Sequence, residues 1–238
     1  MRNIWTITWR ELKAYFVSPL AYILIAAFTV AVGFLFYLNL RASQQASLDS
    51  DFGLAIFLMM FFAPLLTMRL LAEEQRMGTL ELLLTAPVRD YEIVLGKFFA
   101  SLAVYIAMLV PTLWHWFILE RYGSPDTGPV LSGYLGVLLV GGAFLSIGIL
   151  TSALSANQVV AAFVSMATLI MLWVIGAGVS FTAGTGPLAD FLQFLTVTQH
   201  YQDFLNGVID SQHIIYFLSI ILVALFITTR LVESRRWR

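Results

Sequence analysis

Long apolar runs alternate with short polar breaks along the whole chain. Five intervals contain no charged residue: 14–40, 52–68, 98–119, 127–189 and 211–229. A helix needs about 20 apolar residues to cross the hydrocarbon core of a bilayer. Four intervals therefore suit one span each, whereas the longest, 127–189, suits two, divided at the polar segment SALSANQ (152–158). The pattern predicts six membrane-spanning helices, near residues 18–40, 52–71, 94–118, 131–152, 158–181 and 212–231.

Residues 1–17 precede the first span and show a helical period. Apolar residues fall on one face and polar residues on the opposite one: Trp5, Trp9, Leu12 and Phe16 against Asn3, Thr6, Arg10 and Lys13. This pattern is typical of an interfacial helix that lies on the membrane surface with its tryptophans at headgroup depth. A plain anchor that sets the orientation of the chain explains the same pattern.

The most polar stretch, EEQRMGTLELLLTAPVRDYEIVLGK (73–97), lies between the second and third predicted spans. Eight of its 25 residues are charged, in a chain where charged residues make up 11%. We predict that the second helix ends at Gly78, because glycine tolerates the left-handed conformation past a helix C-terminus. Thr79 then caps a short helix, LELLLTA, which Pro87 ends. Asp90 is expected to cap the helix of the third span. We call residues 69–97 the elbow.

The predicted short helix of the elbow has more apolar residues than one membrane-facing side can hold. Leucines occupy positions 80, 82, 83 and 84. A large apolar patch on a polar segment usually marks an interaction site, so we expect a partner to bind here. The alternative is a solvated turn whose leucines rest on lipid.

Prolines and small residues add detail to the predicted bundle. Pro64 and Pro111 lie inside the second and third spans, where each removes a backbone hydrogen bond and can kink its helix. Bent packing and helix movement are both compatible with such kinks. Small residues four positions apart predict close helix contacts, at Gly142 with Ser146 and at Ala161 with Ser165.

The segment 182–212, between the fifth and sixth spans, is long for a connection and contains the amphipathic sequence LADFLQFL. Connections of this length without structure of their own are uncommon. We therefore expect one or two short helices at the outer membrane surface.

Composition and charge agree with a membrane protein. Apolar residues make up 60% of the 238 residues and the mean hydropathy is +0.86, whereas about a quarter of the residues of soluble domains are charged. With both termini in the cytoplasm, eleven Lys and Arg residues lie on the cytoplasmic side and two, Arg41 and Arg121, on the other. This bias predicts cytoplasmic termini. The absence of cysteine excludes disulfides and thiolate metal sites.

No pattern of catalytic residues is visible. The sequence has no HExxH, GxSxG or GxxxxGK[ST] motif and no acidic pair within a span, so no catalytic residue and no metal site is predicted. The three histidines, His115, His200 and His213, are too scattered in the sequence to suggest a ligand set, and His115 is expected to be an interfacial residue of the aromatic belt. The spans lack a centrally placed charge, which disfavours an ion-coupled transporter. Any nucleotide is then bound by another polypeptide, and no cofactor or nucleic acid is expected on this chain.

The six spans, the amphipathic N-terminal helix and the elbow EEQRMGTLELLLTAP resemble an ABC-2-type permease, the membrane half of an ABC exporter. The tail QDFLNGVIDSQHIIYFLSIILVALFITTRLVESRRWR is similar to the gliding-motility-associated branch of that family. The resemblance covers essentially the whole chain as one domain, 1–238. It implies that the elbow carries a coupling helix that docks on a cytoplasmic ATPase. The implied contact residues are Glu73, Glu74, Arg76, Gly78, Thr79, Leu80, Glu81, Leu83, Leu84 and Pro87.

The resemblance also implies a function. Two copies, or one copy and a homologue, would pair in the bacterial inner membrane, each with an ABC ATPase subunit that binds ATP and Mg²⁺, and an auxiliary subunit could join them. ATP-driven closure of the ATPases would then export an amphiphilic or lipid-like substrate. The alternative is a non-transporting membrane subunit that transmits ATPase motion to an extracytoplasmic partner. An ion channel is disfavoured, because no ring of charged side chains or carbonyls is visible in the sequence.

Overall fold

The computed structural model describes residues 2–43, 48–79, 88–123, 126–181 and 196–235. These residues form helices and short connections, and no strand occurs among them. The elements are α1 (Arg2–Val17), α2 (Pro19–Ser43), α3 (Asp49–Arg76), α5 (Asp90–Leu109), the 3-10 turn η1 (Val110–Thr112), α6 (Leu113–Tyr122), α7 (Thr127–Leu154), α8 (Gln158–Phe181), α10 (Val197–Leu205) and α11 (Ser211–Arg235). The predicted all-α fold class is confirmed.

Six helical stretches in the described part of the chain are long and apolar enough to cross a membrane: α2, α3, α5 with α6, α7, α8 and α11. They coincide with the six predicted spans. The helices extend beyond the predicted edges, as in α3, which runs from Asp49 to Arg76 rather than over 52–71. Asp49 and Asp51 lie in its first turn, where the positive end of the helix dipole stabilises acidic side chains.

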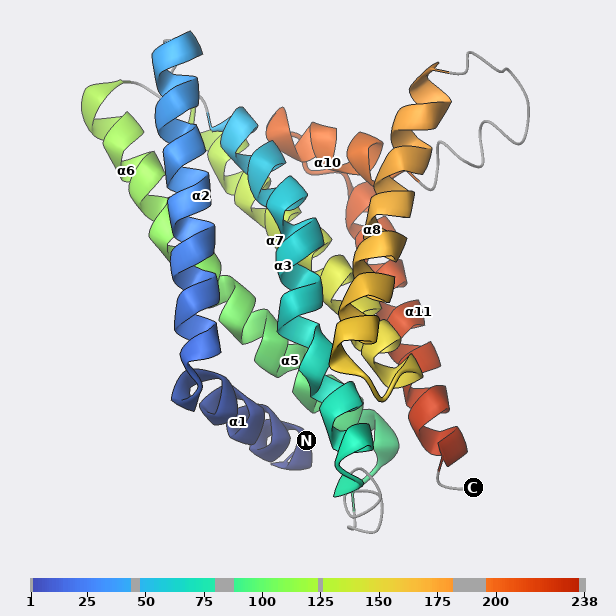
Figure 1. Cartoon of the computed structure of the whole chain (residues 1–238). Coiled ribbons are helices and arrows are strands. Elements are labelled where there is room, and N and C mark those ends of the chain that lie inside the picture. Colours follow the sequence, from blue (N-terminus) through green and yellow to red (C-terminus); the bar gives the residue numbers. More distant parts are fainter. Residues whose placement is uncertain (1, 44–47, 80–87, 124–125, 182–195, 236–238) are drawn as a thin grey trace.

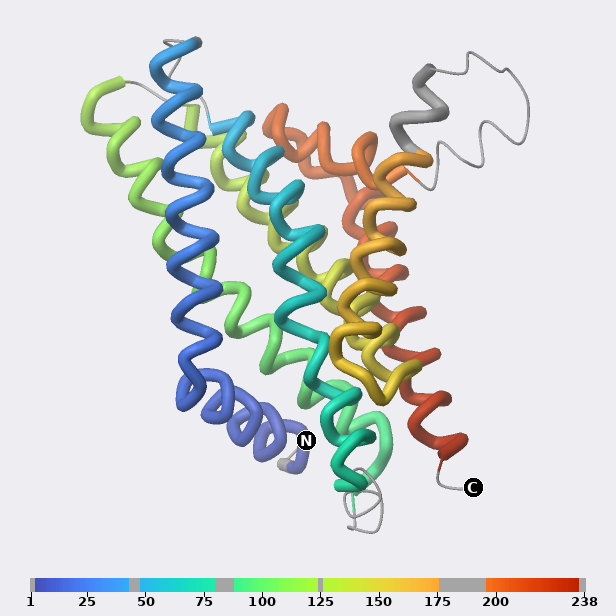
Figure 2. Tube along the Cα trace, viewed as in Figure 1, coloured from blue at the N-terminus to red at the C-terminus, as the bar shows by residue number. Residues whose placement is uncertain are grey.

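Both termini and the two flanks of the elbow lie at the same end of the molecule, which we call the elbow end (Figure 1). The opposite end, which carries α10, is called the far end. The described residues contain six candidate spans, and the Cα trace in Figure 2 shows them running between these two ends. An even number of crossings places the N- and C-termini together.

The centre of the bundle is α7, which packs against α3, α5, α8, α10 and α11. Close approach depends on its small residues, because a Cβ at Gly148 would lie 2.1 Å from Oγ1 of Thr67, and one at Gly141 would lie 2.2 Å from Cε1 of Tyr105. Ser146 is fully buried and Gly142 faces Ile221. The closest approaches of this span are thus at Gly141 and Gly148, whereas the predicted Gly142 faces only the end of the Ile221 side chain, at 3.3 Å. At the other predicted pair, Ala161 and Ser165 of α8 are both buried.

The N-terminal helix α1 lies across the elbow end and packs on α5 (Figure 1). Trp5 and Trp9 are 69% and 50% exposed, so the tryptophan face points away from the protein. Ile7, Thr8 and Tyr15 are buried on another face, which the two-face pattern of the sequence did not reveal. The hydroxyl of Thr8 donates to the carbonyl oxygen of Gly96 at 3.1 Å.

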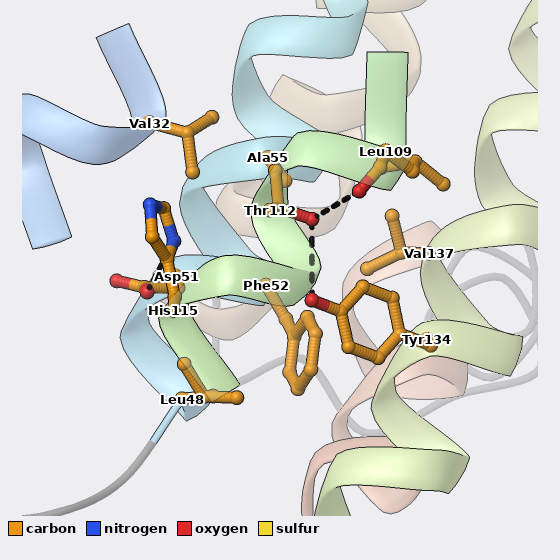
Figure 3. Close-up of a pocket in the computed structure, with 10 residues that line it drawn as sticks. All are labelled: Val32, Leu48, Asp51, Phe52, Ala55, Leu109, Thr112, His115, Tyr134 and Val137. Atoms are coloured by element: carbon orange, nitrogen blue, oxygen red, sulfur yellow. Dashed lines mark hydrogen bonds and ion pairs between the residues drawn. The ribbon is translucent and has the colours of Figure 1, made fainter. Parts of the chain in front are cut away.

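The two prolines lie in different surroundings. Pro64 lies inside α3, which continues through it as one helix. At Pro111 the third span is interrupted by η1, and the hydroxyl of Thr112 there donates to the carbonyl oxygen of Leu109 at 2.7 Å (Figure 3). A proline cannot donate to the helix ladder, and a short 3-10 turn accommodates that loss.

The start of α5 corrects one detail of the sequence analysis. Asp90 was expected as the helix cap, but it is the first helical residue, and Arg89 is the N-cap. The backbone N–H of Arg89 donates to Oε2 of Glu92 at 3.0 Å. The Glu92 carboxylate thus gives the backbone N–H of Arg89 a partner. The N-cap of α5 is therefore Arg89, one residue before the predicted Asp90.

The helix α10 is a short helix between the fifth and sixth spans, as expected there. The sequence LADFLQFL, where another short helix was predicted, lies outside the described residues.

Candidate functional site

Some of the predicted contact residues lie on the flanks of the elbow that the structure describes. The helix α3 ends at Arg76, and Gly78 has a φ of 67°, the left-handed conformation expected at this stop. Glu73, Arg76, Gly78 and Thr79 are exposed. Leu80, Glu81, Leu83, Leu84 and Pro87, with the predicted coupling helix, lie outside the described residues.

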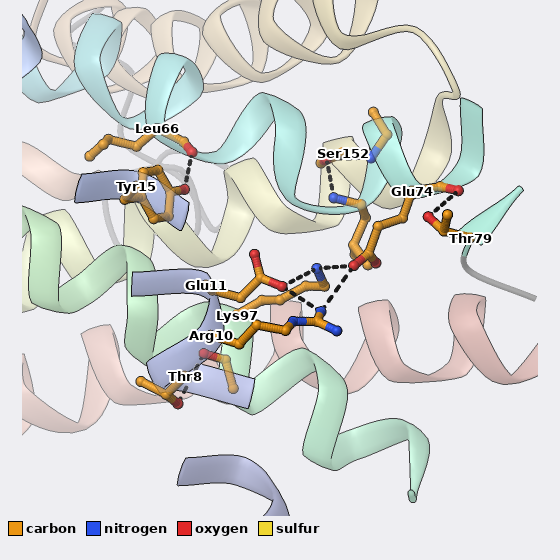
Figure 4. A network of polar contacts seen from close by, with 12 residues as sticks. Thr8, Arg10, Glu11, Tyr15, Leu66, Glu74, Thr79, Lys97 and Ser152 are labelled. Atoms are coloured by element: carbon orange, nitrogen blue, oxygen red, sulfur yellow. Dashed lines mark hydrogen bonds and ion pairs between the residues drawn. The ribbon is translucent and has the colours of Figure 1, made fainter. Parts of the chain in front are cut away.

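Glu74 points inward and belongs to a cluster of four charged side chains from α1, α3 and α5, shown in Figure 4. The ammonium of Lys97 lies 2.7 Å from Oε1 of Glu74 and 3.2 Å from Oε1 of Glu11. The guanidinium of Arg10 lies 2.7 Å from Glu11 and 3.4 Å from Glu74. We call these four residues the ion cluster.

Lys97 carries its charge in a buried position, where it needs opposite charges close by. Its side chain is only 1% exposed, although it is a lysine on a helix that crosses the membrane. A buried ammonium is tolerated when opposite charges surround it closely, as Glu74 and Glu11 do here. Burial by itself would raise the pKa of Glu11, but the charges of Lys97 and Arg10 outweigh it and hold that pKa below its usual range. Glu11 therefore stays a carboxylate between these two cations.

Tyr15 joins α1 to α3 beside the ion cluster. Its ring is buried, its hydroxyl donates to the carbonyl oxygen of Leu66, and the guanidinium of Arg69 lies 4.3 Å from the ring centroid (Figure 4). Burial raises the pKa of Tyr15, so the hydroxyl keeps its proton as a donor. The arginine lies over the ring, where a cation interacts favourably with the aromatic quadrupole.

Ser152 of α7 binds the same part of α3 from the other side. Its Oγ accepts from the backbone N–H groups of Leu71 and Ala72, each at 3.1 Å, and donates to the carbonyl oxygen of Met68 at 3.0 Å. Gln75 donates to the carbonyl oxygen of Ala153 at 3.0 Å. The last two turns of α3 are thus bound to α1, α5 and α7 together.

Arg235 at the end of α11 donates to the same Ala153 carbonyl oxygen, at 3.0 Å. This carbonyl lies in the last turn of α7, where backbone oxygens have no partner within their own helix. The elbow end is consequently a joint of five helices, α1, α3, α5, α7 and α11, held together by these side-chain contacts.

The other predicted residues of the N-terminal helix are arranged around this joint. Trp5 and Trp9 stack with ring centroids 6.4 Å apart, and the ammonium of Lys13 lies 5.4 Å from the Trp9 ring. Arg10, assigned to the polar face, reaches the ion cluster. No local pattern indicates that Glu11 and Lys97 meet, because 86 positions separate them.

A second polar site lies in the far half of the molecule (Figure 3). His115 is 7% exposed, its ring stacks on Phe36 with centroids 4.4 Å apart, and its Nδ1 lies 3.5 Å from Oδ2 of Asp51. The prediction of His115 as an aromatic-belt residue is therefore wrong, because α6 turns this side chain toward α2 and α3. Thr112 and Tyr134 lie beside the pair, their hydroxyl oxygens 3.2 Å apart.

These groups line a small cavity of about 10 Å³. A cavity of that size has room for about one water molecule. It is too small for an organic substrate.

His200 and His213, which the sequence places apart, are neighbours at the far end. Their Nδ1 atoms are 2.8 Å apart, and Nε2 of His213 lies 2.6 Å from Oδ2 of Asp203. The packing of α10 on α11 brings them together, so the sequence-based view of three scattered histidines is wrong for this pair. Within the described ranges, no three His, Asp or Glu side chains form a group that could hold a metal ion.

The fold defines a polytopic helical membrane protein, with a joint of interhelical polar contacts at the elbow end. A family model for ABC-2 family transporter proteins matches residues 31–232. The chain therefore belongs to the ABC-2 transporter family, and it is a membrane component of a transporter of this kind. A search of curated proteins found no match. The gliding-motility-associated branch stays a prediction.

Proposed function

We propose that this protein is the permease subunit of an ATP-driven ABC exporter that moves an amphiphilic or lipid-like substrate out of the cytoplasm or the inner leaflet. Family membership and the six spans support a permease. The observation that carries the proposal is the joint at the elbow end, where the end of α3 is bound to α1, α5 and α7. Such a joint suits a permease that receives motion at one end.

In this proposal the elbow end faces the cytoplasm of a bacterial cell, as the Lys and Arg bias favours. A separate ABC ATPase binds ATP and Mg²⁺ and docks on the elbow. Glu73, Arg76 and Thr79 are exposed on the described side of this surface and are available to a partner. Glu74 acts within the protein, by binding Lys97 of α5 and Arg10 of α1.

Closure of the ATPases would displace the elbow and tilt α3. Because the ion cluster and Ser152 bind α3 to its neighbours, the tilt is shared by the bundle and opens a path at an interface between subunits. We propose that a second copy of this chain provides that interface. Large apolar side chains are exposed along α2, α8 and α11, which leaves apolar surface for both lipid and a second subunit.

The docking proposal is tested by charge reversal at the elbow. We expect Glu73→Arg with Arg76→Glu to weaken retention of the ATPase during co-purification by about tenfold, because hydrogen bonds to charged groups contribute roughly 1.5–3 kcal/mol each. The matched control is Glu120→Arg with Arg121→Glu, an adjacent exposed pair on α6 near the far end.

The control pair should leave ATPase retention and ATP hydrolysis unchanged. Equal retention by the elbow variant and the wild type, with both proteins folded, would contradict docking at the elbow. Glu81→Arg with Leu83→Asp then tests the predicted coupling helix in the same assay.

Transmission of ATPase motion to an extracytoplasmic partner is the second candidate. The observation that favours it is that one helix, α3, carries both Glu74 of the ion cluster and Asp51 of the far-half site. Reconstituted complexes distinguish the two. ATP-dependent movement of a fluorescent phospholipid or amphiphile between leaflets supports export, whereas hydrolysis without movement of any tested amphiphile supports transmission.

A further inference from the structure

A groove of about 520 Å³ separates the start of α5 from the last turns of α11. On α11 it is lined by one continuous helical face: Leu222, Leu225, Phe226, Thr229, Arg230 and Glu233. On α5 it is lined by Arg89, Asp90, Tyr91 and Leu95. The two helices contact each other beside it, at the elbow end of the molecule (Figure 1).

The walls of the groove change from polar to apolar with depth. Its charged residues all lie at the elbow end of the two helices, and its α11 wall toward the middle of the span is formed by Leu222, Leu225 and Phe226. Eleven residues separate Leu222 from Glu233, which is about 16 Å along a helix. One leaflet of the hydrocarbon core is about 15 Å thick. With its charged rim in the headgroup region, the groove therefore reaches through part of one leaflet toward the membrane centre.

The polar rim carries charges of both signs. Arg89 and Arg230 contribute two cations, and Asp90 and Glu233 contribute two anions. Arg230 lies 2.6 Å from Glu233, yet the two side chains are 61% and 41% exposed, so each keeps surface for a further contact. A rim with balanced charge matches a zwitterionic headgroup better than an anionic one, because each charge of the headgroup finds an opposite partner.

A second groove serves as a contrast. It lies between α1 and α5 and has a volume of about 580 Å³, and its described lining residues carry no charge, among them Trp5, Trp9, Phe99 and Ile106. These residues can contact acyl chains but offer nothing charged to a headgroup. Headgroup recognition is thus confined, of these two grooves, to the one between α5 and α11.

We propose that the groove between α5 and α11 binds one glycerophospholipid of the elbow-side leaflet with a primary-amine headgroup. The phosphate binds Arg89 and Arg230, and the ammonium binds Asp90 and Glu233. One acyl chain follows Leu95, Phe226 and Leu222 toward the membrane centre. The site holds the start of α5, which follows the elbow, against the end of α11. It does not depend on export being the function.

Native mass spectrometry of the purified, delipidated full chain tests the site, with phosphatidylethanolamine or phosphatidylglycerol of identical acyl chains added back. Two variants probe it: Thr229→Trp fills the middle of the groove, and Arg89→Gln with Arg230→Gln removes both cations. We expect each to lower the fraction of protein with bound phosphatidylethanolamine by about tenfold, because the indole blocks the groove and the loss of the arginines removes charge-assisted hydrogen bonds to the phosphate. The wild type should prefer phosphatidylethanolamine over phosphatidylglycerol.

Matched controls carry the same substitutions elsewhere. Ile215→Trp changes an exposed position of α11 outside the groove, and Arg41→Gln with Arg121→Gln removes two exposed arginines at the ends of α2 and α6. Both should bind lipid like the wild type. Equal phosphatidylethanolamine binding by Thr229→Trp and Ile215→Trp overturns the site, and a preference for phosphatidylglycerol overturns the amine headgroup. Loss of ATPase retention with unchanged lipid binding in Thr229→Trp would instead assign the groove to the protein partner.

Discussion

Lys97 shows how a single residue at the membrane boundary acquires a structural role. In the sequence it is one of several basic residues of the elbow, which the positive-inside rule explains sufficiently. In the structure it is buried, and it lies between the carboxylates of Glu11 and Glu74. Its ammonium is the group that joins α5 to both α1 and α3. Replacing Lys97 should therefore destabilise the joint more than replacing an exposed charged residue.

We expect Lys97→Met to destabilise the protein by roughly 3–5 kcal/mol, because it leaves Glu11 and Glu74 close together without the buried cation between them. Thermal unfolding in detergent, followed by circular dichroism, measures the loss. The same substitution at the exposed Lys13 is the control and should cost less than about 1 kcal/mol, the size of a cation–π contact at an exposed site. Similar unfolding temperatures for the two variants would contradict a structural role for the ion cluster.

At the scale of helices, the contact between α3 and α7 is the tightest part of the bundle. It depends on Gly148, where the nearest atom to an added Cβ is Oγ1 of Thr67 at 2.1 Å. The Thr67 hydroxyl itself donates to the carbonyl oxygen of Ala63 at 2.8 Å, so its position is fixed. Gly142 on the same helix faces the flexible end of Ile221 at 3.3 Å. The two glycines should consequently respond differently to the same substitution.

Gly148→Ala should destabilise the protein by about 1–3 kcal/mol, the usual cost of overpacking a well-packed contact. Gly142→Ala should be neutral or stabilising, since alanine is favoured over glycine in a helix by about 1 kcal/mol. Adding Thr67→Ala to Gly148→Ala removes the clashing atoms and should restore part of the loss. Equal effects at both glycines, or no rescue, would show that the two helices approach less closely than described.

At the scale of the whole molecule, the joint connects the elbow to the rest of the bundle. If α3 transmits force from the elbow, as proposed, then contacts that do not touch the ATPase should still affect coupling. Ser152 is such a contact, because it is fully buried and binds the backbone of α3 at three positions.

We therefore expect Ser152→Ala to keep the ATPase bound but to lower ATP-dependent substrate movement by several fold at unchanged hydrolysis. Reconstituted complexes with both readouts check this. Ser155→Ala is the control, since the Ser155 hydroxyl bonds only locally, to Asn157. If Ser152→Ala lowers binding and hydrolysis together, the serine supports the docking surface rather than transmission.

The sequence by itself determined the fold class, the six spans, the N-terminal helix, the stop at Gly78 and the family. Each of these depends on sums or periods over neighbouring residues, or on a short motif, and so can be predicted from local sequence. The elbow was recognised for the same reason, because its charges are close together in the chain.

Only the tertiary structure decided which polar residues meet. Lys97 contacts Glu74, His115 stacks on Phe36 and Ser152 binds Leu71, and these pairs join helices that are separated by tens of residues. Hydropathy places a helix in the membrane but does not fix its rotation about its own axis. That rotation is set by packing, as at Gly148 against Thr67, and it brings Lys97 to the ion cluster and His115 to Asp51 rather than to lipid.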